Sequence, residues 1–566
     1  MNKRKECIWH IQKGDPDWIK EFPQNSMYEY LKSTAQTHLN SCAIEFEGNK
    51  ISYKKLLQQI DIVADAFSAS GIKKGDCISI ISINTPQIVT SIYAANKIGA
   101  VVNMIHPLLS TTEIKKFVQD TNSVAVIILD QIYPKIEKIS WDNNFNPQII
   151  LTRIVDALPL LIKPLYTIKA KINITLNAKH NCIYWTDFLK SGKSCNIVSD
   201  NNKTSAEDVA VIMYSGGTTG IPKGVMLTNY NINSYGIIVS EVIKPVKPVG
   251  KKFLAILPLF HGFGFASGIH ANLTQGVHIY LIPKFEFKKS VDLIFKKKIN
   301  FMYSVPALFE GIIRSPRIEK TDLSFFECLL CGGDKLPKRL NNKFSELLKQ
   351  GNASTVFCEG YGQTECVACS IINPYFAVNS DSIGITVPDI EAKVVEIGTQ
   401  NEVPNDEDGE LCICGPTIMK GYFNNEEETA KALQIHSDGK TWLHTGDLVS
   451  RDDNGYFYFK QRISRMVISA GYNVYVTQME KVINECDEIL ECCVVGIPDR
   501  VLGQKIRAYI VPANDSINEN TLKNIVIEKC KENFAEYSQP HDIRIIKKLP
   551  MTHIGKVDFK LLENEK

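Results

Sequence analysis

Short apolar runs alternate with stretches of helical spacing over the first third of the chain. Residues 77–82, 100–104 and 124–129 are predicted strands, and residues 86–97 carry apolar positions at helical spacing. A proline opens that stretch, and the first turn of a helix tolerates proline. Strand, helix and strand in this order predict βαβ units and an α/β sheet.

The last hundred residues follow a different pattern. After about residue 462, β-rich stretches at 492–496 and 507–511 precede a helical stretch at 521–533 and a polar strand and loop at 543–558. These elements are enough for a small second domain of about 100 residues.

Composition narrows the class of protein. The 566 residues are 44% hydrophobic and 22% charged, which indicates a globular chain of at least two packed units. Lys and Arg number 64 and Asp and Glu number 62, so the net charge is +2. A near-neutral chain offers no electrostatic reason to expect nucleic acid as a partner.

Membrane spans and export signals are not expected. The longest apolar stretch, residues 88–109, is interrupted by Asn96, Lys97, Asn103 and His106, whereas a spanning helix needs about 20 mostly apolar residues. The basic N-terminus is not followed by the apolar core of a secretory signal. We therefore expect a cytoplasmic protein.

Sixteen cysteines raise the question of disulfides or zinc. Without an export signal, reduced thiols are the favoured interpretation. The pairs Cys328/Cys331 and Cys366/Cys369 lie much further apart than the roughly 15–20 residues that usually separate two such pairs in a zinc site. Cys328 and Cys331 also lie in a predicted strand, where residues three apart point to opposite faces. Buried apolar cysteine is the favoured prediction.

Residues 156–166 form an apolar segment with lysines nearby. A surface loop packed on the core is the favoured interpretation. A peripheral membrane contact stays open as the functional alternative.

The most informative segment, residues 214–225, follows the apolar strand 209–213 and ends near Lys223. Its glycines let backbone N–H groups approach an anion closely, and its hydroxyl side chains can donate to phosphate oxygens. A Walker A loop ends in Gly-Lys-Ser/Thr, whereas two residues separate the last glycine from the lysine here. We predict a phosphate-binding loop that does not belong to a plain P-loop NTPase.

This segment closely resembles the phosphate-binding signature of the adenylate-forming superfamily, which contains acyl-CoA synthetases, amino-acid adenylation domains and firefly-type luciferases. The further motifs of that family follow in the expected order at residues 258–264, 332–337, 361–365, 409–411, 421–422, 444–448, 462, 471–474 and 555–556. The resemblance covers nearly the whole chain. It extends, more weakly, to bacterial long-chain fatty-acid:CoA ligases around Pro159.

The resemblance implies an α/β fold with two domains. A large N-terminal domain of packed α/β sheets with a β subdomain is followed by a small, mobile α+β C-terminal domain. We expect the large adenylation (AMP-binding) domain at 1–460, the hinge at 461–465 and the small mobile domain at 466–566.

Transfer of AMP to a carboxylate joins two anions, so the site must screen negative charge and position both groups. By resemblance, Glu365 holds Mg²⁺, which prefers carboxylate and phosphate oxygens. Tyr361 has a flat face for adenine, and for Lys223 a plain surface lysine stays equally open. The ATP- and AMP-binding residues implied are Ser215, Gly216, Gly217, Thr218, Thr219, Gly220, Lys223, Gly333, Tyr361, Gly362, Thr364, Asp447, Arg462 and Lys556.

Four residues are expected to carry the chemistry: Lys556, Thr364, Glu365 and His261. Lys556 would neutralise charge that develops between the carboxylate and the α-phosphate, and Thr364 would donate to that phosphate. His261 borders the carboxylate pocket as a gate. With Gly262 and Gly264 it would line an acyl pocket, because small residues leave room for an elongated apolar acid. By resemblance, Gly471 lines the thiol channel.

The sequence departs from the family at Gln461, Ser464 and Ile468, where glycine, aspartate or lysine, and lysine are usual. These changes leave adenylation intact and bear on the second half-reaction.

The resemblance thus predicts an ATP- and Mg²⁺-dependent carboxylate:CoA ligase for a fatty or other apolar acid. No aspartate that would pair an α-ammonium stands beside His261, so an amino acid is disfavoured. Transfer to an acyl carrier protein, or a non-catalytic acyl or nucleotide binder, are the alternatives.

Overall fold

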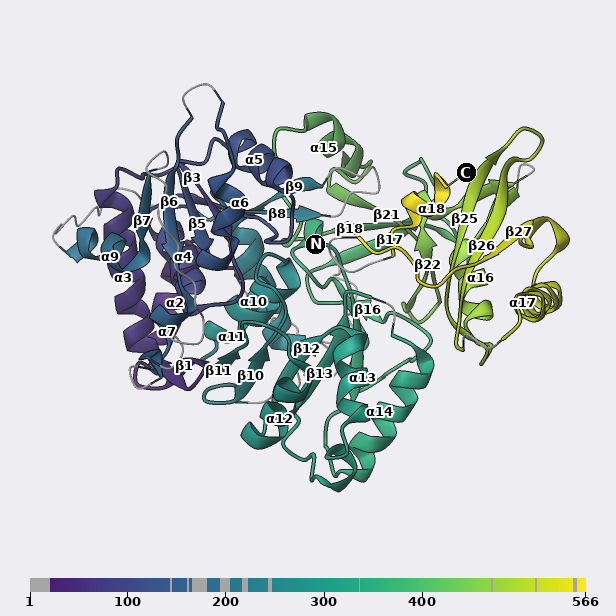
Figure 1. The fold of residues 1–566 in the computed structure, drawn as a ribbon, viewed down its shortest axis with the longest axis horizontal. Coiled ribbons are helices and arrows are strands. Elements are labelled where there is room, and N and C mark those ends of the chain that lie inside the picture. Colours follow the sequence, from purple (N-terminus) through teal and green to yellow (C-terminus); the bar gives the residue numbers. More distant parts are fainter. Residues whose placement is uncertain are drawn as a thin grey trace. The chain divides into compact units, whose positions relative to one another are not determined.

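The computed structural model describes residues 21–142, 145–159, 162–164, 181–193, 204–215, 222–242, 247–334, 336–469, 472–514, 517–552 and 557–565. The chain divides into two compact units (Figure 1). Unit 1 comprises residues 1–392 and 413–443, and unit 2 comprises residues 393–412 and 444–566. The predicted α/β class with large N-terminal sheets and a β-rich C-terminal part is confirmed.

The first sheet of unit 1 has the strand order β19-β9-β8-β4-β3-β5-β6-β7. Its central strands run parallel, whereas β9 and β19 run antiparallel to their neighbours. The predicted strands and helix of the first third are confirmed as β3, β4, β5 and α4. The bounds are β3 Cys77–Ile81, β4 Val101–Met104, β5 Ala125–Leu129, β6 Gln148–Thr152, β7 Cys182–Tyr184, β8 Val209–Ser215, β9 Lys223–Thr228 and β19 Gly421–Tyr422.

The second sheet of unit 1 has the order β16-β15-β14-β13-β12-β10-β11-β1-β2. Strands β13 and β14 are parallel neighbours, with Gly332 opposite Gly360, so their carboxyl ends share one edge. The bounds are β1 Cys42–Phe46, β2 Asn49–Ser52, β10 Lys252–Ala255, β11 His278–Leu281, β12 Phe301–Ser304, β13 Cys328–Gly332, β14 Phe357–Tyr361, β15 Ile371–Ile372 and β16 Ile385–Thr386. Cys328 and Cys331 therefore lie in a strand, as predicted.

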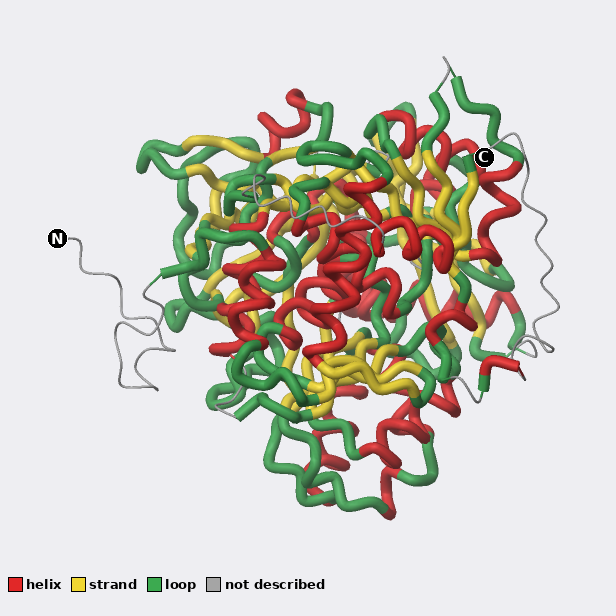
Figure 2. Tube along the Cα trace, turned by 90° about the vertical axis from the view of Figure 1, so that its left-hand side faces the viewer, coloured by secondary structure: helices red, strands yellow, loops and turns green. Residues whose placement is uncertain are grey.

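The helices of unit 1 pack beside these strands (Figure 2). Helix α5 begins with a capping box, in which the Ser110 hydroxyl and the Glu113 carboxylate each satisfy a backbone N–H of the other. The bounds are α2 Met27–Ala35, α3 Tyr53–Ala69, α4 Pro86–Lys97, α5 Thr111–Asp120, α6 Tyr133–Glu137, α7 Ile154–Ala157, α9 Trp185–Lys193, α10 Asn229–Val242, α11 Ala271–Leu273, α12 Phe287–Lys297, α13 Pro306–Arg314, α14 Lys338–Gln350 and α15 Glu426–Ala432. Strand β20 (Leu433–Ile435) pairs with residues 441–443.

Unit 2 contains two groups of strands. In the first, β21 (Thr441–Arg451) pairs antiparallel with β22 (Phe457–Arg462), and β18 (Gly409–Cys414) lies between β21 and β17 (Glu391–Val395). The second has the order β24-β23-β26-β25, with β27 beside β26. Its bounds are β23 Val467–Ser469, β24 Tyr472–Val474, β25 Ile489–Asp499, β26 Gly503–Pro512 and β27 Asp542–Ile545.

The predicted tail elements at 492–496, 507–511 and 521–533 are confirmed within β25, β26 and α17 (Glu519–Asn533). Helices α16 (Val476–Ile483) and α17 cover one apolar core with these strands, and α18 (Phe559–Glu563) joins a second. The hinge at 461–465 and the mobility of the small domain stay predictions. Among the described residues, no helix is both long enough and apolar enough to cross a membrane.

Candidate functional site

The phosphate-binding segment connects two antiparallel strands. Strand β8 ends at Ser215 and β9 begins at Lys223, and the strand register places these two residues directly opposite each other. The predicted phosphate contacts Gly216, Gly217, Thr218, Thr219 and Gly220 lie outside the described residues.

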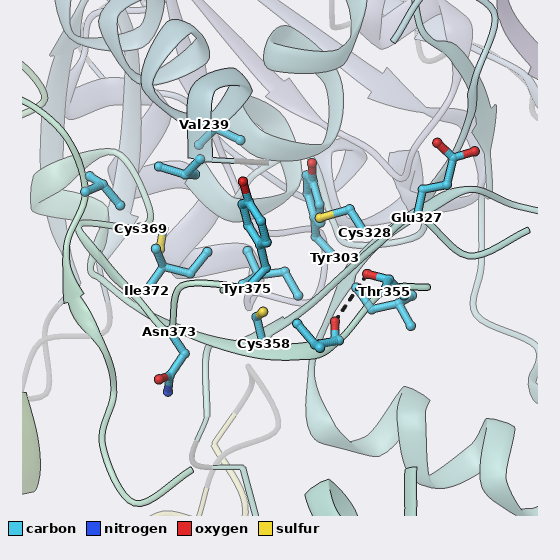
Figure 3. Close-up of a pocket in the computed structure, with 15 residues that line it drawn as sticks. Val239, Tyr303, Glu327, Cys328, Thr355, Cys358, Cys369, Ile372, Asn373 and Tyr375 are labelled. Carbon is cyan, nitrogen blue, oxygen red and sulfur yellow. Dashed lines mark hydrogen bonds between the residues drawn. The ribbon is translucent and has the colours of Figure 1, made fainter. Parts of the chain in front are cut away.

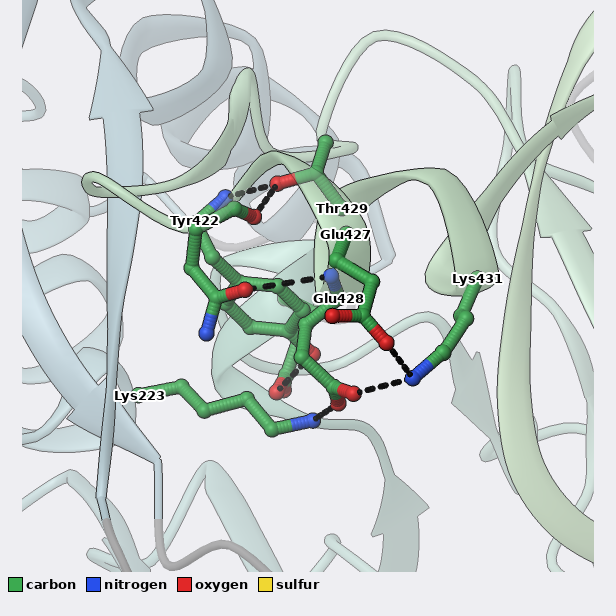
Figure 4. Close-up of polar contacts among 8 residues, drawn as sticks. Lys223, Tyr422, Glu427, Glu428, Thr429 and Lys431 are labelled. Carbon is green, nitrogen blue, oxygen red and sulfur yellow. Dashed lines mark hydrogen bonds and ion pairs between the residues drawn. The ribbon is translucent and has the colours of Figure 1, made fainter.

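Lys223 has a partner that the sequence did not suggest. Its ammonium forms an ion pair with the Glu428 carboxylate of α15 and lies 4.8 Å from the centre of the Tyr422 ring (Figure 4). Glu428 also pairs with Lys431 at 2.9 Å. Hydrogen bonds from Lys223 and Lys431 lower the pKa of the Glu428 carboxyl to about 2. Lys223 and Glu428 are 205 positions apart, so no local pattern could have linked them.

Glu365, the predicted metal ligand, lies in the short 3₁₀ helix η4 (Thr364–Cys366), which packs against β8 and β9. The residue is 8% exposed. Its Oε1 accepts a hydrogen bond of 3.0 Å from the Tyr422 hydroxyl. Within the described part of the chain its carboxylate forms no ion pair. A buried carboxylate in this setting suits a bound cation as a partner.

Tyr361 is the last residue of β14 and Gly362 follows it, beside Gly333, which follows β13. Ligands of open parallel sheets commonly bind at this edge. A Cβ atom on Gly362 would lie 1.5 Å from the carbonyl oxygen of Ala368, so only glycine fits there. The Gln363 side chain donates to the Tyr361 hydroxyl at 3.3 Å.

His261 belongs to a cluster of rings. The centroid of the His261 ring lies 4.7 Å from that of Phe260 and 6.2 Å from that of His106. The ring centroids of His106 and Phe260 are 4.4 Å apart. The Leu108 backbone N–H donates to Nδ1 of His106 at 3.0 Å, so that nitrogen carries no proton. His106 follows β4, and the motif analysis did not single it out as a site residue.

Gly262 and Gly264 allow close backbone packing. A Cβ atom on Gly262 would lie 1.8 Å from the carbonyl oxygen of Val367, and one on Gly264 would lie 2.0 Å from that of Pro258. Val367 itself has φ +69°, which a β-branched residue rarely adopts. Glycine is thus required at both positions because the neighbouring backbone leaves no room for a Cβ atom. This corrects the expectation that the two glycines leave open space. Their place in an acyl pocket stays a prediction.

An apolar cavity of about 40 Å³ lies in unit 1 (Figure 3). It is lined among others by Tyr303, Cys328, Cys358, Cys369 and Val239. Burial raises the pKa of the Cys358 and Cys369 thiols to about 12, so both are protonated and apolar at neutral pH.

Tyr303 also borders a narrow space next to Phe263, Gly264 and Gly268. These residues begin two positions after His261, in a π-helical stretch, Phe263–His270. Tyr303 therefore borders both the cavity and this narrow space.

Unit 2 brings two of the predicted ATP- and AMP-binding residues together. Asp447 on β21 lies directly opposite Arg462 on β22. Arg462 Nε is 2.8 Å from Oδ1 of Asp447, whose side chain is fully buried, whereas Arg462 is 42% exposed. Arg462 also donates to the Thr445 carbonyl at 3.3 Å.

Glu410 holds the turn that carries Asp447. One of its oxygens lies 2.9 Å from Nδ1 of His444, and the other accepts the Gly446 N–H at 3.0 Å. Glu410 belongs to the family motif at residues 409–411, for which the resemblance predicts no role. The structure shows that the motif positions a turn 34 to 36 residues further along the chain.

Lys556 and Gly471 lie outside the described residues. Ser464 lies in the 3₁₀ helix η5 (Ile463–Arg465), whose last residue, Arg465, pairs with Glu480 of α16 at 2.7 Å.

Comparisons with known proteins agree with this geometry. Residues 31–423 match the family model "AMP-binding enzyme", and residues 478–556 match "AMP-binding enzyme C-terminal domain". A long-chain-fatty-acid–CoA ligase of Bacillus subtilis is 30% identical over 97% of this chain and 98% of that protein. A probable 4-coumarate–CoA ligase of Dictyostelium discoideum is 29% identical over 82% of this chain and 81% of that protein.

Solved structures share the fold. ATP-bound MatB of Rhodopseudomonas palustris has a TM-score of 0.80 at 22% identity, over 96% of this chain and 98% of that one. A fatty acyl CoA synthetase of Mycobacterium tuberculosis has a TM-score of 0.69 at 23% identity, over 95% of this chain and 97% of that one. The superfamily identified from the motifs is thereby confirmed, and the chain belongs to the family of AMP-binding enzymes.

Proposed function

We propose that the chain is an AMP-forming ligase that joins an apolar carboxylic acid to CoA. In the first step a carboxylate oxygen attacks the α-phosphorus of ATP, the bond to the bridging oxygen breaks, and pyrophosphate leaves. In the second step the thiol sulfur of CoA attacks the acyl carbon, and AMP leaves with the electron pair of the acyl–oxygen bond. The thiol proton passes to solvent.

The buried Glu365 carboxylate carries this proposal. It lies beside β8 and β9, which border the phosphate-binding segment, and its hydrogen-bond donor is a neutral hydroxyl. A Mg²⁺ ion held there would screen the phosphate charge. Thr364 would donate to the α-phosphate, and Tyr361 would stack on adenine at the edge formed by β13 and β14.

Lys223 would hold the outer phosphates together with Ser215 and the glycine-rich segment. In unit 2, Asp447 would accept hydrogen bonds from the ribose hydroxyls, and Arg462 would fix its orientation. Lys556 and Gly471 keep their roles as predicted, in adenylation and in the thiol channel.

The acid is proposed to be apolar because thiols, aliphatic side chains and aromatic rings make up most of the lining of the cavity beside Tyr303, which also includes Glu327, Thr355 and Asn373. Its 40 Å³ is far below the roughly 300–1,000 Å³ of typical ligand sites, so side chains must move before a chain enters. The relatives from Bacillus subtilis and Dictyostelium discoideum, with their fatty-acid and 4-coumarate names, agree with an apolar acid.

Substitution at Val239 tests the cavity. Val239→Phe fills it and should shorten the preferred acid, because each excluded methylene forfeits about 0.8 kcal/mol of burial. Val239→Ala is the matched control, which enlarges the cavity and should favour longer acids. An unchanged chain-length profile in both variants would place the acid elsewhere.

Pyrophosphate release with a panel of acids tests the activity itself. Fatty and aryl acids should support release, and an amino acid should not. Release that needs no acid would contradict adenylation of an acid, and no release with any acid would favour a non-catalytic binder.

The thiol acceptor separates the two ligase hypotheses. Free CoA and a phosphopantetheine carrier protein share one thiol arm, so both are offered to preformed acyl-AMP. If thioester forms only on the carrier protein, the carrier protein and not CoA is the acceptor. A cytoplasmic location is part of the same proposal. A peripheral membrane contact through residues 156–166, of which 160, 161, 165 and 166 lie outside the described residues, stays the alternative to a surface loop.

A further inference from the structure

Tyr422 contacts two predicted site groups at once. Its hydroxyl donates to Oε1 of Glu365 at 3.0 Å, and the ammonium of Lys223 lies over its ring at 4.8 Å from the centroid (Figure 4). Glu365 is the predicted metal ligand and Lys223 a predicted phosphate contact. One side chain therefore contacts both the predicted metal ligand and the predicted phosphate-binding lysine.

The backbone holds Tyr422 firmly. Strand β19 pairs with β9, which places Tyr422 opposite Val225, two residues after Lys223. The Tyr422 N–H donates to Oγ1 of Thr429 at 2.8 Å, and that hydroxyl donates to the Asn425 carbonyl at 2.8 Å. Tyr422 is 7% exposed. Its ring therefore has little freedom to move when a ligand arrives.

The two contacts suit two different tasks. A hydroxyl donor orients one oxygen of a carboxylate without neutralising it, so the charge of Glu365 stays available to a cation. The negative face of the ring attracts an ammonium group without removing its N–H donors, so Lys223 can still reach an anion. An arginine or lysine in place of Tyr422 would instead compete with the metal.

We propose that Tyr422 is a positioning residue that orients the Glu365 carboxylate for Mg²⁺ through its hydroxyl and steadies Lys223 for the phosphates through its ring. This inference rests on the proposed function, because it takes Glu365 as the metal ligand. Neither half of it requires Tyr422 to touch a substrate.

The test is calorimetric binding of ATP to the full chain, once with Mg²⁺ and once with EDTA. The ratio of the two affinities measures how much Mg²⁺ tightens binding, independently of turnover. Tyr422→Phe removes the hydroxyl and keeps the ring. We expect it to reduce that ratio about tenfold, as the loss of a hydrogen bond behind a metal ligand typically does, and to leave binding in EDTA unchanged.

Tyr422→Leu removes the ring as well. We expect the same loss of Mg²⁺ dependence and, in addition, roughly threefold weaker binding in EDTA, because Lys223 loses the ring face. Thermal unfolding of both variants checks that the fold is kept. Tyr28→Phe is the matched control, because it removes a hydroxyl that donates to the Asp61 carboxylate at 2.8 Å, outside the predicted site residues. It should change neither affinity.

Glu365→Gln distinguishes failure of the inference from failure of the proposed function. If Glu365→Gln loses the Mg²⁺ dependence and Tyr422→Phe keeps it, the positioning role of Tyr422 is overturned while the metal role of Glu365 stands. If Glu365→Gln keeps it, both the metal role and the inference are overturned. A Tyr422→Phe variant that weakens binding equally with and without Mg²⁺ would make the hydroxyl merely structural, which also overturns the inference.

Discussion

Glu365 in unit 1 and Asp447 in unit 2 are both buried carboxylates placed by family motifs, but their surroundings differ. Glu365 accepts a hydrogen bond from the neutral Tyr422 hydroxyl, whereas Asp447 is paired with the Arg462 guanidinium at 2.8 Å. A buried carboxylate without a cationic neighbour favours the arrival of a cation. One that is already neutralised is instead suited to accept hydrogen bonds from neutral hydroxyl groups. We therefore propose that the same functional group is prepared for a metal in one unit and for a sugar in the other.

The largest expected effect tests Glu365, which forms no ion pair with any described residue. Glu365→Gln should reduce acid-dependent pyrophosphate release by about 10²-fold or more, because a neutral amide binds Mg²⁺ poorly and screens no charge. The loss should lessen as Mg²⁺ is raised. Release near the wild-type rate at limiting Mg²⁺ would remove the contrast with Asp447.

Asp447→Asn should weaken the binding of ATP without changing the requirement for Mg²⁺. We expect the KM for ATP to rise about tenfold, because the ribose loses a charged acceptor and the Arg462 guanidinium loses its partner. The Mg²⁺ concentration for half-maximal rate should stay the same. Asp453→Asn is the control, since Asp453 is exposed and accepts from Asn405 at 2.8 Å. A changed Mg²⁺ requirement in Asp447→Asn would break the comparison.

A smaller effect is expected at Glu428, which forms an ion pair with Lys223. Glu428→Gln should lower the KM for ATP about threefold at low ionic strength, since a competing carboxylate is removed from the ammonium. Salt should reduce the difference, because the pair is partly exposed. Glu427→Gln is the matched control, because Glu427 pairs with Lys431 at 2.6 Å and not with Lys223. Equal effects of both variants would mean that only net charge matters.

The smallest expected effect concerns pH: the effect of Glu428→Gln on the KM for ATP should not change with pH. Lys223 and Lys431 lower the pKa of Glu428 from its ordinary 4.5 to about 2. A lowered carboxyl pKa means that the ion pair is complete above about pH 4.5 and is lost only as the pH falls toward 2. The ratio of KM values between Glu428→Gln and wild type should therefore be constant from pH 5.5 to 8.5 within assay error, roughly a factor of two. A ratio that drifts within that range would contradict the lowered pKa.

Much of the fold and part of the candidate site could be predicted from the residues alone. Strands β3, β4 and β5 and helix α4 follow from local periodicity, because burial of one face or of both faces of an element leaves its mark within a few residues. The motifs likewise singled out Glu365 and Asp447 with their expected ligands.

Tertiary structure alone decided which groups surround these residues. Tyr422 reaches Glu365 across 57 positions, and Glu428 reaches Lys223 across 205. Gly262 is required by the carbonyl of Val367, a segment that no periodicity connects to it. Sequence patterns record how each residue is buried, whereas partners depend on strand order and register, which bring distant segments to one edge. The order of elements and the type of chemistry were therefore determined by the sequence, and the contacts around the two carboxylates only by the folded chain.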